Sequence, residues 1–272
     1  MKPDARVSVG TVSVWHFRAA AGVFAVLALA EIVGQALRGV EGAGPAGWLL
    51  LLAAAAWLVG LVWRERVGVG RAWLCLGWVV LMSLCAMILA ERSGILFGRM
   101  EFTGREIVSA GGVPLSVPLL WWLMVGGGYL VVESLWGEWR VGLSAFTALV
   151  TVQMALMILP FAGHLRDYWR WPAEAPGGGY FGVPWMVLAA WFTLALGLAL
   201  GLVIFGDNWS SAEARTRRQA WAPAAVLMTL TMICLGAHLA AGLWLAAAFT
   251  AANAVLFGAM VVWYLRDRRT AA

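Results

Sequence analysis

The chain has 272 residues and a formal net charge of +5, and 62% of its residues are hydrophobic while only 12% are charged. Soluble domains carry about 25% charged residues, so this composition excludes a soluble globular protein, and the small positive charge needs no nucleic-acid partner to explain it. The composition predicts an integral membrane protein built from helices, which satisfy their own backbone polar groups in lipid.

Eight apolar stretches follow one another along the chain, each close to the roughly 20 residues that a membrane-spanning helix needs. They cover residues 17–37, 47–63, 72–90, 114–135, 141–163, 184–205, 221–240 and 243–265. Little chain remains outside them, so residues 1–272 are expected to form one all-α polytopic membrane domain. A short Ala-Gly break separates the last two stretches, and one kinked hairpin is the alternative to two spans there.

The first stretch begins after Lys2 and Arg6, a basic flank that secretory signals also carry. Its apolar run is longer than a signal core and contains Glu31 and Gln35, so we expect a retained helix. A carboxylate deep in a membrane helix is a candidate functional group. Gln35 or a serine is its expected partner.

The distribution of basic residues predicts a multi-pass protein of the cell membrane with both termini in the cytoplasm. With the N-terminus inside, cytoplasmic segments hold 13 of the 19 lysines and arginines and outer segments hold the other six. Positive charge concentrates on the cytoplasmic side of membrane proteins. In this topology the connections 91–112 and 164–183 both lie on the outer face.

Residues that usually bind metals or cofactors are few. Cys75, Cys85 and Cys234 all fall inside predicted spans without a C-x-x-C pair, which is typical of small buried residues. The sequence contains no phosphate-binding, dinucleotide, nucleophile-elbow or zinc-protease motif. His164 and His238 would permit a bis-histidine haem, but packing is the commoner role, so we expect no metal and no cofactor.

The connections 91–112 and 164–183 are long and rich in aromatic and charged residues. Six charges in the first connection cancel in sum, which indicates ion pairs within a structured loop. The alternative is a belt of interfacial aromatics with solvated charges. Outside these loops, Glu133 and Glu138 lie at the cytoplasmic end of a span and are expected to be interfacial charges.

The tripeptide Gly-Val-Pro occurs twice, each time with a tryptophan seven residues after the proline: Pro114 with Trp121, and Pro184 with Trp191. Proline suits the first turn of a helix, so both units are expected to open helices that enter from the outer side. Positions i and i+7 share one helix face. The pattern suggests an internal parallel repeat of helices 3–4 and 5–6 with both indoles facing one cleft, and the alternative is a common helix entry followed by an interfacial anchor.

The run AERSGILFGRMEFTG, followed by GVPLSVPLLWWLM, resembles the signature of membrane carotenoid biosynthesis proteins, a family that includes carotenoid hydratases. The matching positions of this specific block are Glu91, Gly94, Phe97, Gly98, Arg99, Glu101, Phe102, Thr103, Gly112, Val113, Pro114 and Trp121. A second, less specific block keeps Trp169, Trp171, Gly182, Val183, Pro184 and Trp191. The resemblance covers residues 90–195, and the ends agree only in hydropathy.

The chain departs from the family pattern in two places. The fifth span reads QMALMILP, which keeps Pro160 but lacks the acids that the family carries there. The segment WMVLAAW after the second Gly-Val-Pro keeps only Trp191 of the family's residues. These losses favour a changed substrate or a lost activity, so a non-catalytic isoprenoid carrier or a pathway assembly partner is the alternative to an enzyme.

The resemblance implies a hydratase that adds water to the terminal C=C of an acyclic carotenoid. Such an enzyme needs a protonated acid, whose pKa burial would raise, and aromatic faces that shelter a carbocation. This chemistry requires no metal or nucleotide. The expected catalytic residues are Glu91, Glu101 and Asp167. The expected substrate-binding residues are Phe97, Arg99, Phe102, Trp121, Trp169, Trp171, Tyr180 and Trp191.

Ordinary structural roles remain the alternatives for the acids. Glu91 is then expected to pair with Arg92 or Arg99, and Asp167 with Arg166 or Arg170. The expected partners are a carotenoid or other polyisoprenoid substrate, the lipid bilayer and other enzymes of the same pathway.

Overall fold

The computed structural model describes residues 14–136, 139–171, 179–206 and 221–270. Within these ranges eight helices are long and apolar enough to cross a membrane, so the protein is an all-α polytopic membrane protein, as expected. The helices are α1 (Val14–Arg38), α2 (Gly44–Val67), α3 (Val69–Ser93), the continuous α4–η2–α5 (Ser116–Trp121, Trp122–Gly127, Gly128–Trp136), α6–η3 (Arg140–Ile158, Leu159–Leu165), α7 (Trp185–Gly206), α9 (Trp221–Ala240) and α10 (Trp244–Thr270). The break before Trp244 separates α9 from α10 as two helices. A 3-10 turn, η1 (Gly39–Glu41), joins α1 to α2.

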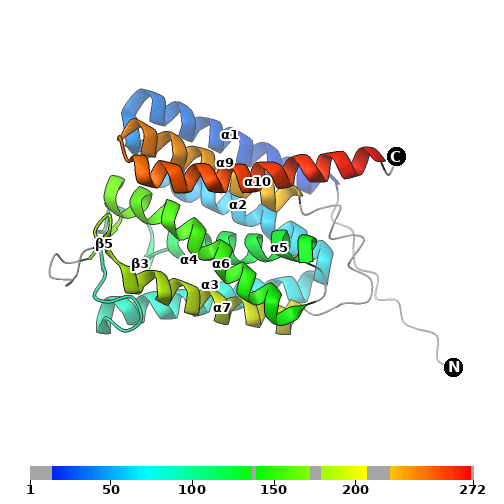
Figure 1. Cartoon of the computed structure of the whole chain (residues 1–272), viewed down its shortest axis with the longest axis horizontal. Coiled ribbons are helices and arrows are strands. Elements are labelled where there is room, and N and C mark those ends of the chain that lie inside the picture. Colours follow the sequence, from blue (N-terminus) through cyan, green and yellow to red (C-terminus); the bar gives the residue numbers. More distant parts are fainter. Residues whose placement is uncertain (1–13, 137–138, 172–178, 207–220, 271–272) are drawn as a thin grey trace.

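Two groups of helices pack around the α4–η2–α5 helix (Figure 1). Helices α1, α9 and α10 lie along one flank, and α3 and α7 lie along the other. The central helix is the most buried of the spans, as expected for a helix with no lipid-facing stripe. Trp122 Nε1 donates to the Ala56 carbonyl of α2 at 3.2 Å, and Trp63 Nε1 of α2 donates to the Gly126 carbonyl at 3.1 Å. These bonds fix the central helix at its π-helical part, η2.

The connections 91–112 and 164–183, predicted from charge to lie on the outer face, are called the outer connections below. Within the described residues they are structured by six short strands, which form three antiparallel pairs. Strand β1 (Glu101–Phe102) pairs with β4 (Trp169–Arg170), so the two connections that carry the sequence motifs are joined to each other. The other pairs are the hairpins β2–β3 (Ser109–Ala110, Val113–Pro114) and β5–β6 (Gly179–Tyr180, Val183–Pro184). An ion pair supports the pairing of β1 with β4, because Arg170 Nε lies 3.5 Å from Glu101 Oε2 across it. The expected structured loops are therefore present, although residues 172–178 of the second connection lie outside the described part of the chain.

The expectation that each Gly-Val-Pro proline opens a helix is wrong. Pro114 and Pro184 each end the second strand of a hairpin, and the helices begin after them, at Ser116 and Trp185. Both turns have positive φ at their two central residues, Gly111–Gly112 and Phe181–Gly182. Such two-residue turns reverse the chain direction. Val-Pro therefore pairs antiparallel with the two residues before the turn, and the helix begins only after this strand.

The two hairpins have the same register, but the helices that follow them differ. Helix α4 passes after six residues into the π-helical η2, whereas α7 continues as an α-helix for 22 residues. The internal repeat of helices 3–4 and 5–6 therefore stays a prediction.

Glu133 is not the interfacial charge that the sequence suggested. Its carboxylate accepts from Arg66 Nε at 2.8 Å and also pairs with Arg66 Nη2, and only 11% of its side chain is exposed. Arg66 Nη1 donates in addition to the Gly206 carbonyl at 3.0 Å, so this pair joins α2, α5 and α7. Glu138 lies outside the described residues.

Candidate functional site

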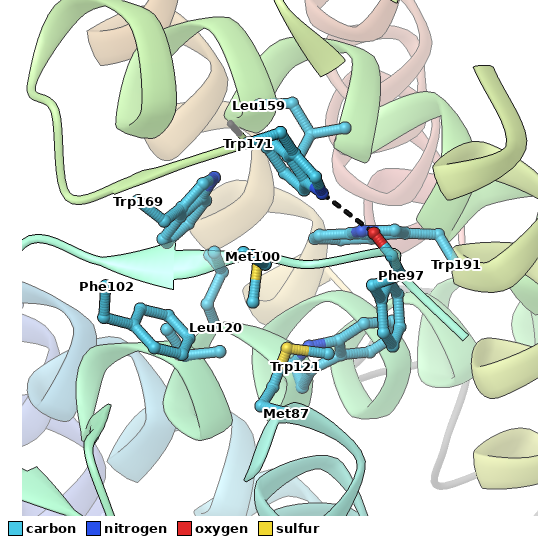
Figure 2. Close-up of a pocket in the computed structure, with 11 residues that line it drawn as sticks. Met87, Phe97, Met100, Phe102, Leu120, Trp121, Leu159, Trp169, Trp171 and Trp191 are labelled. Carbon is cyan, nitrogen blue, oxygen red and sulfur yellow. Dashed lines mark hydrogen bonds between the residues drawn. The ribbon is translucent and has the colours of Figure 1, made fainter. Parts of the chain in front are cut away.

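A cluster of aromatic and methionine side chains, here called the aromatic slot, lies where the two outer connections meet α3, α4 and α7 (Figure 2). Six of its residues are expected substrate-binding residues: Phe97, Phe102, Trp121, Trp169, Trp171 and Trp191. The others are Met87, Met100, Val117, Leu120 and Leu159. The space left between them is about 10 Å³, room for about one water molecule. A larger ligand enters only if lining side chains move, and methionines adapt most readily.

The indoles of Trp121 and Trp191 stack on each other in the slot. Their rings stack with centroids 4.5 Å apart and an angle of 28° between their planes. Trp121 follows the first Gly-Val-Pro and Trp191 the second, so these two indoles face one another, as the repeat hypothesis required. Phe102 and Trp169, neighbours across the β1–β4 pair, meet edge to face at 6.5 Å.

Hydrogen bonding leaves two fully buried indole N–H groups of the slot without an acceptor among the described residues. Trp171 Nε1 donates to the Phe97 carbonyl at 2.8 Å, the dashed bond in Figure 2. Trp121 Nε1 and Trp169 Nε1 are buried, and no described residue accepts their hydrogens. Buried donors are rarely left unpaired in proteins, so these two N–H groups mark places where an oxygen atom of a ligand or a water would be stabilised.

A second cavity, here called the polar cup, adjoins the slot on the side of the outer connections. It has a volume of about 260 Å³ and shares Trp169 and Trp171 with the slot. Its remaining lining residues are Gly163, His164, Asp167, Arg170, Phe181, Gly182 and Val183. A Cβ atom on Gly163 would lie 3.2 Å from Trp169 Nε1. The free N–H of Trp169 is therefore close to the wall of the cup.

The three expected catalytic carboxylates occupy different positions around these cavities. Asp167 lines the cup, adopts a positive φ of 51° and lies 3.9 Å from Arg105 Nε. Its ion-pair partner is thus Arg105 and not Arg166 or Arg170. Glu91 lies one turn beyond the slot residue Met87 on α3, beside the turn at Gly112, where a Cβ would come within 2.7 Å of Glu91 Oε2. Among the described residues no arginine pairs with Glu91.

Glu101, Arg99 and Tyr180 do not line the slot or the cup. Glu101 alternates along the strand with the slot residues Met100 and Phe102, so it points to the opposite face. Its side chain is exposed beside Arg170. Arg99 is exposed, and Tyr180 is buried in strand β5 with its hydroxyl donating to the Leu156 carbonyl at 2.8 Å. Burial raises the pKa of Tyr180 to about 12.

A buried ion pair joins the second connection to α1. The side chains of Glu31 and Arg166 are both fully buried, and Arg166 Nη2 donates to Glu31 Oε1. Arg166 Nε also donates to the Val40 carbonyl at 2.9 Å, and Glu31 Oε2 accepts from the Ala43 N–H at 3.0 Å. Gln35 donates to Glu31 at 3.2 Å as expected, but the sequence did not indicate that Arg166 is the charged partner.

The Arg166 guanidinium also lies over the rings of Trp48 and Phe161, at 5.3 and 4.5 Å from their centroids. Gly42 makes room for the pair, because a Cβ there would overlap Glu31 Oε1 and Arg166 Nη2. Arg166 immediately precedes Asp167, Tyr168 and Trp169, so this pair positions residues of both cavities.

Glu106 is a further carboxylate of the outer loops that the sequence did not single out. It is partly buried and accepts from Ser116 Oγ at the start of α4. Burial raises the pKa of Glu106, although the Ser116 hydrogen bond and the nearby Arg166 charge act in the opposite direction. Burial likewise raises the pKa of Tyr168, whose hydroxyl lies 3.5 Å from Arg166 Nη1.

The structure gives no group of metal-binding side chains within the described residues. His164 lines the cup beside Phe181, with 5.8 Å between ring centroids. His238 is buried in α9, and its Nδ1 lies 3.0 Å from Thr250 Oγ1 of α10. Thr250 uses its own hydrogen on the Ala246 carbonyl, so His238 Nδ1 is the donor in that contact.

Comparison with known proteins agrees with the resemblance noted in the two outer connections. Neither the curated proteins nor the solved structures contain a significant match to the chain. The model of the carotenoid biosynthesis protein family matches residues 46–257, a range that includes every residue lining the slot and the cup. The chain therefore belongs to the carotenoid biosynthesis protein family.

Proposed function

We propose that this protein is a carotenoid hydratase, which adds water to a terminal C=C bond of an acyclic carotenoid in the cell membrane. The observation that carries the proposal is an apolar aromatic slot that adjoins a polar cup and shares Trp169 and Trp171 with it. Hydration of a hydrocarbon requires such a boundary, because the alkene must be sheltered while water is close by.

The reaction divides into three steps. A carboxylic acid transfers its proton to the less substituted alkene carbon, and the π bond breaks to leave a tertiary carbocation. A water oxygen then forms the new C–O bond with that carbon. The resulting oxonium returns one proton to a carboxylate, so the acid is regenerated and the product is a tertiary alcohol.

The aromatic residues suit the cationic step. The face of an indole attracts a cation, with a stabilisation of about 2 kcal/mol or more when water is excluded. Trp121 and Trp191 present stacked indoles on one side of the slot, and Trp169 and Phe102 lie on another. The free N–H groups of Trp121 and Trp169 would stabilise the oxygen atom of the bound alcohol.

We assign proton donation to Glu91 and the orientation of water to Asp167. Glu91 lies on the face of α3 that also carries the slot residue Met87, and Asp167 lines the cup. Glu101 is the least favourable of the expected acids because it is exposed and points away from Phe102. Arg99 and Tyr180 line neither cavity, so we assign them no part in the reaction.

The alternative is a carotenoid carrier or pathway assembly partner that binds the polyene without reacting. One observation favours it: the eleven residues that line the slot include no carboxylate. On this alternative the aromatic residues serve binding alone, and the free indole N–H groups select an end group that already carries oxygen.

Expression in a lycopene-producing host with mass analysis of the pigments tests the proposal. The wild type should give pigments heavier by one water per hydrated end, and Glu91→Gln should lower their yield about 10²–10⁴-fold, the usual contribution of a general acid. Glu101→Gln is the matched control and should retain activity. Pigment that co-purifies with the wild type without any hydrated product would instead support the carrier, and full activity of Glu91→Gln would show that Glu91 is not the proton donor and leave Asp167 as the next candidate.

A further inference from the structure

A second apolar cavity lies between α2 and α3, and Leu119 of α4 also lines it. It is an open groove of about 320 Å³. Ala56, Gly60 and Ala72 form part of its lining, and Trp57 and Trp73 stand along it with exposed fractions of 45% and 68%. Because exposed indoles stand beside short side chains, the groove has apolar walls and opens to the hydrocarbon of the lipid bilayer.

The small residues Ala56, Gly60 and Ala72 leave the space of the groove between its larger lining residues. Helices α2 and α3 are joined by a single residue, Gly68, with φ of 85°, and they are in contact with each other. At Gly60 an added Cβ atom would meet no atom within 4 Å. A larger side chain at this position would therefore fill the groove without disturbing the packing around it.

One end of the groove is charged. Arg64 lines it, and no carboxylate of the described residues pairs with this guanidinium. Arg66, two residues on, is by contrast fully engaged with Glu133 and the Gly206 carbonyl. Arg64 lies at the end of α2 that is remote from the motif loops, since Glu41, just before the other end of α2, pairs with Arg105 of the first connection at 3.6 Å.

An apolar groove that ends at an unpaired arginine fits a molecule with a hydrocarbon chain and an anionic headgroup. The residues from Ala56 to Arg64 cover about 12 Å along the helix axis, which is less than half of a bilayer core about 30 Å thick. The groove thus stays within one leaflet. We propose that it is a binding site for an anionic phospholipid, with one acyl chain beside Gly60 and the headgroup phosphate on Arg64.

A carotenoid hydrocarbon is the competing occupant, but it offers nothing to a guanidinium. Arg64 is therefore the residue that distinguishes the two ligands, whereas Gly60 reports on chain occupancy by either. The proposal is independent of the hydratase reaction, because the groove shares no lining residue with the slot.

Native mass spectrometry of the purified full chain tests the site, with dioleoyl phosphatidylglycerol or dioleoyl phosphatidylcholine added to the detergent. The wild type should retain phosphatidylglycerol in preference to phosphatidylcholine. Arg64→Gln should lower this preference about fivefold, because one arginine at an anionic lipid surface contributes about 1 kcal/mol. Gly60→Leu should remove retention of both lipids.

Gly197→Leu on α7 is the matched control, because Gly197 likewise has no atom within 4 Å of an added Cβ and does not line the groove. It should behave like the wild type. Equal retention of phosphatidylglycerol by wild type, Arg64→Gln and Gly60→Leu would overturn the proposal. A carotenoid that is lost from Gly60→Leu, with phosphatidylglycerol retention unchanged, would overturn it as well and assign the groove to the polyene.

Discussion

Glu106 is a single carboxylate whose protonation should affect the stability of the outer loops. Burial raises its pKa in the folded protein. The folded state therefore binds a proton more tightly than the unfolded chain, and the stabilisation that this provides is fully present below the unfolded pKa and is lost as the pH rises through the folded pKa. Glu106→Gln keeps an acceptor for Ser116 Oγ but removes the titration.

We expect the melting temperature of Glu106→Gln in detergent to depend less on pH than that of the wild type. The two proteins should be similar near pH 4, and the variant should melt higher near pH 7. Glu101→Gln removes an exposed carboxylate from the same loop and is the control. Parallel melting curves for wild type and Glu106→Gln across this range would contradict the assignment.

Aromatic residues of the site were predictable from the sequence, whereas methionines were not. Phe97, Trp121 and Trp191 lie in or next to long, charged connections, where bulky rings require an explanation. Met87 and Met100 lie in a chain that is 62% hydrophobic, so nothing in their sequence context separates them from ordinary packing residues. Their place in the slot follows only from the three-dimensional structure, which brings Met87 of α3 and Met100, the residue before β1, to the same cavity.

The Glu31–Arg166 pair joins two elements that are far apart in the sequence, and removing one partner should be costly. A buried charge without its partner destabilises a protein by about 3–5 kcal/mol. Arg166→Met should therefore lower the free energy of unfolding by that order, as measured in mixed micelles. Glu31→Leu combined with Arg166→Met should recover much of the loss, because no buried charge then remains.

The exposed pair Glu101–Arg170 is the matched comparison for this cycle. Its side chains are 56% and 65% exposed, and pairs of this kind contribute about 0–1 kcal/mol. Equal effects of breaking the two pairs would show that Glu31–Arg166 is not held in a water-free environment. A double variant no more stable than Arg166→Met would show that the packing around Arg166, not the charge, provides the stability.

The spans could be predicted from the sequence, but the hairpins and the ion-pair partners could not. The spans were predictable because apolar length is local information. The fold of Gly-Val-Pro into a hairpin depends on positive φ at Phe181, a residue type that rarely adopts it. The pairing of Glu101 with Arg170 and of Glu31 with Arg166 depends on which segments meet in space, and spacing along one chain does not contain that information.

At the scale of the whole molecule, the β1–β4 pair places both motif connections on one face of the membrane. Which face this is follows from charge alone, since 13 of the 19 basic residues fall on the other side in the predicted topology. A reporter fused after Ala272 should be active in the cytoplasm, and one inserted near Gly178, outside the described residues, should be exposed externally.

A third reporter near Ser210, also outside the described residues, should lie on the same side as the one at Ala272. Two spans, α9 and α10, separate these positions, so the chain crosses the membrane and returns. The reverse pattern in all three would turn the polar cup toward the cytoplasm and place Arg64 in the outer leaflet. Water for hydration would then come from the cytoplasm, and the phospholipid of the α2–α3 groove would have to be an outer-leaflet lipid. Sidedness therefore determines from which compartment the slot is supplied with water and from which leaflet the groove takes its ligand.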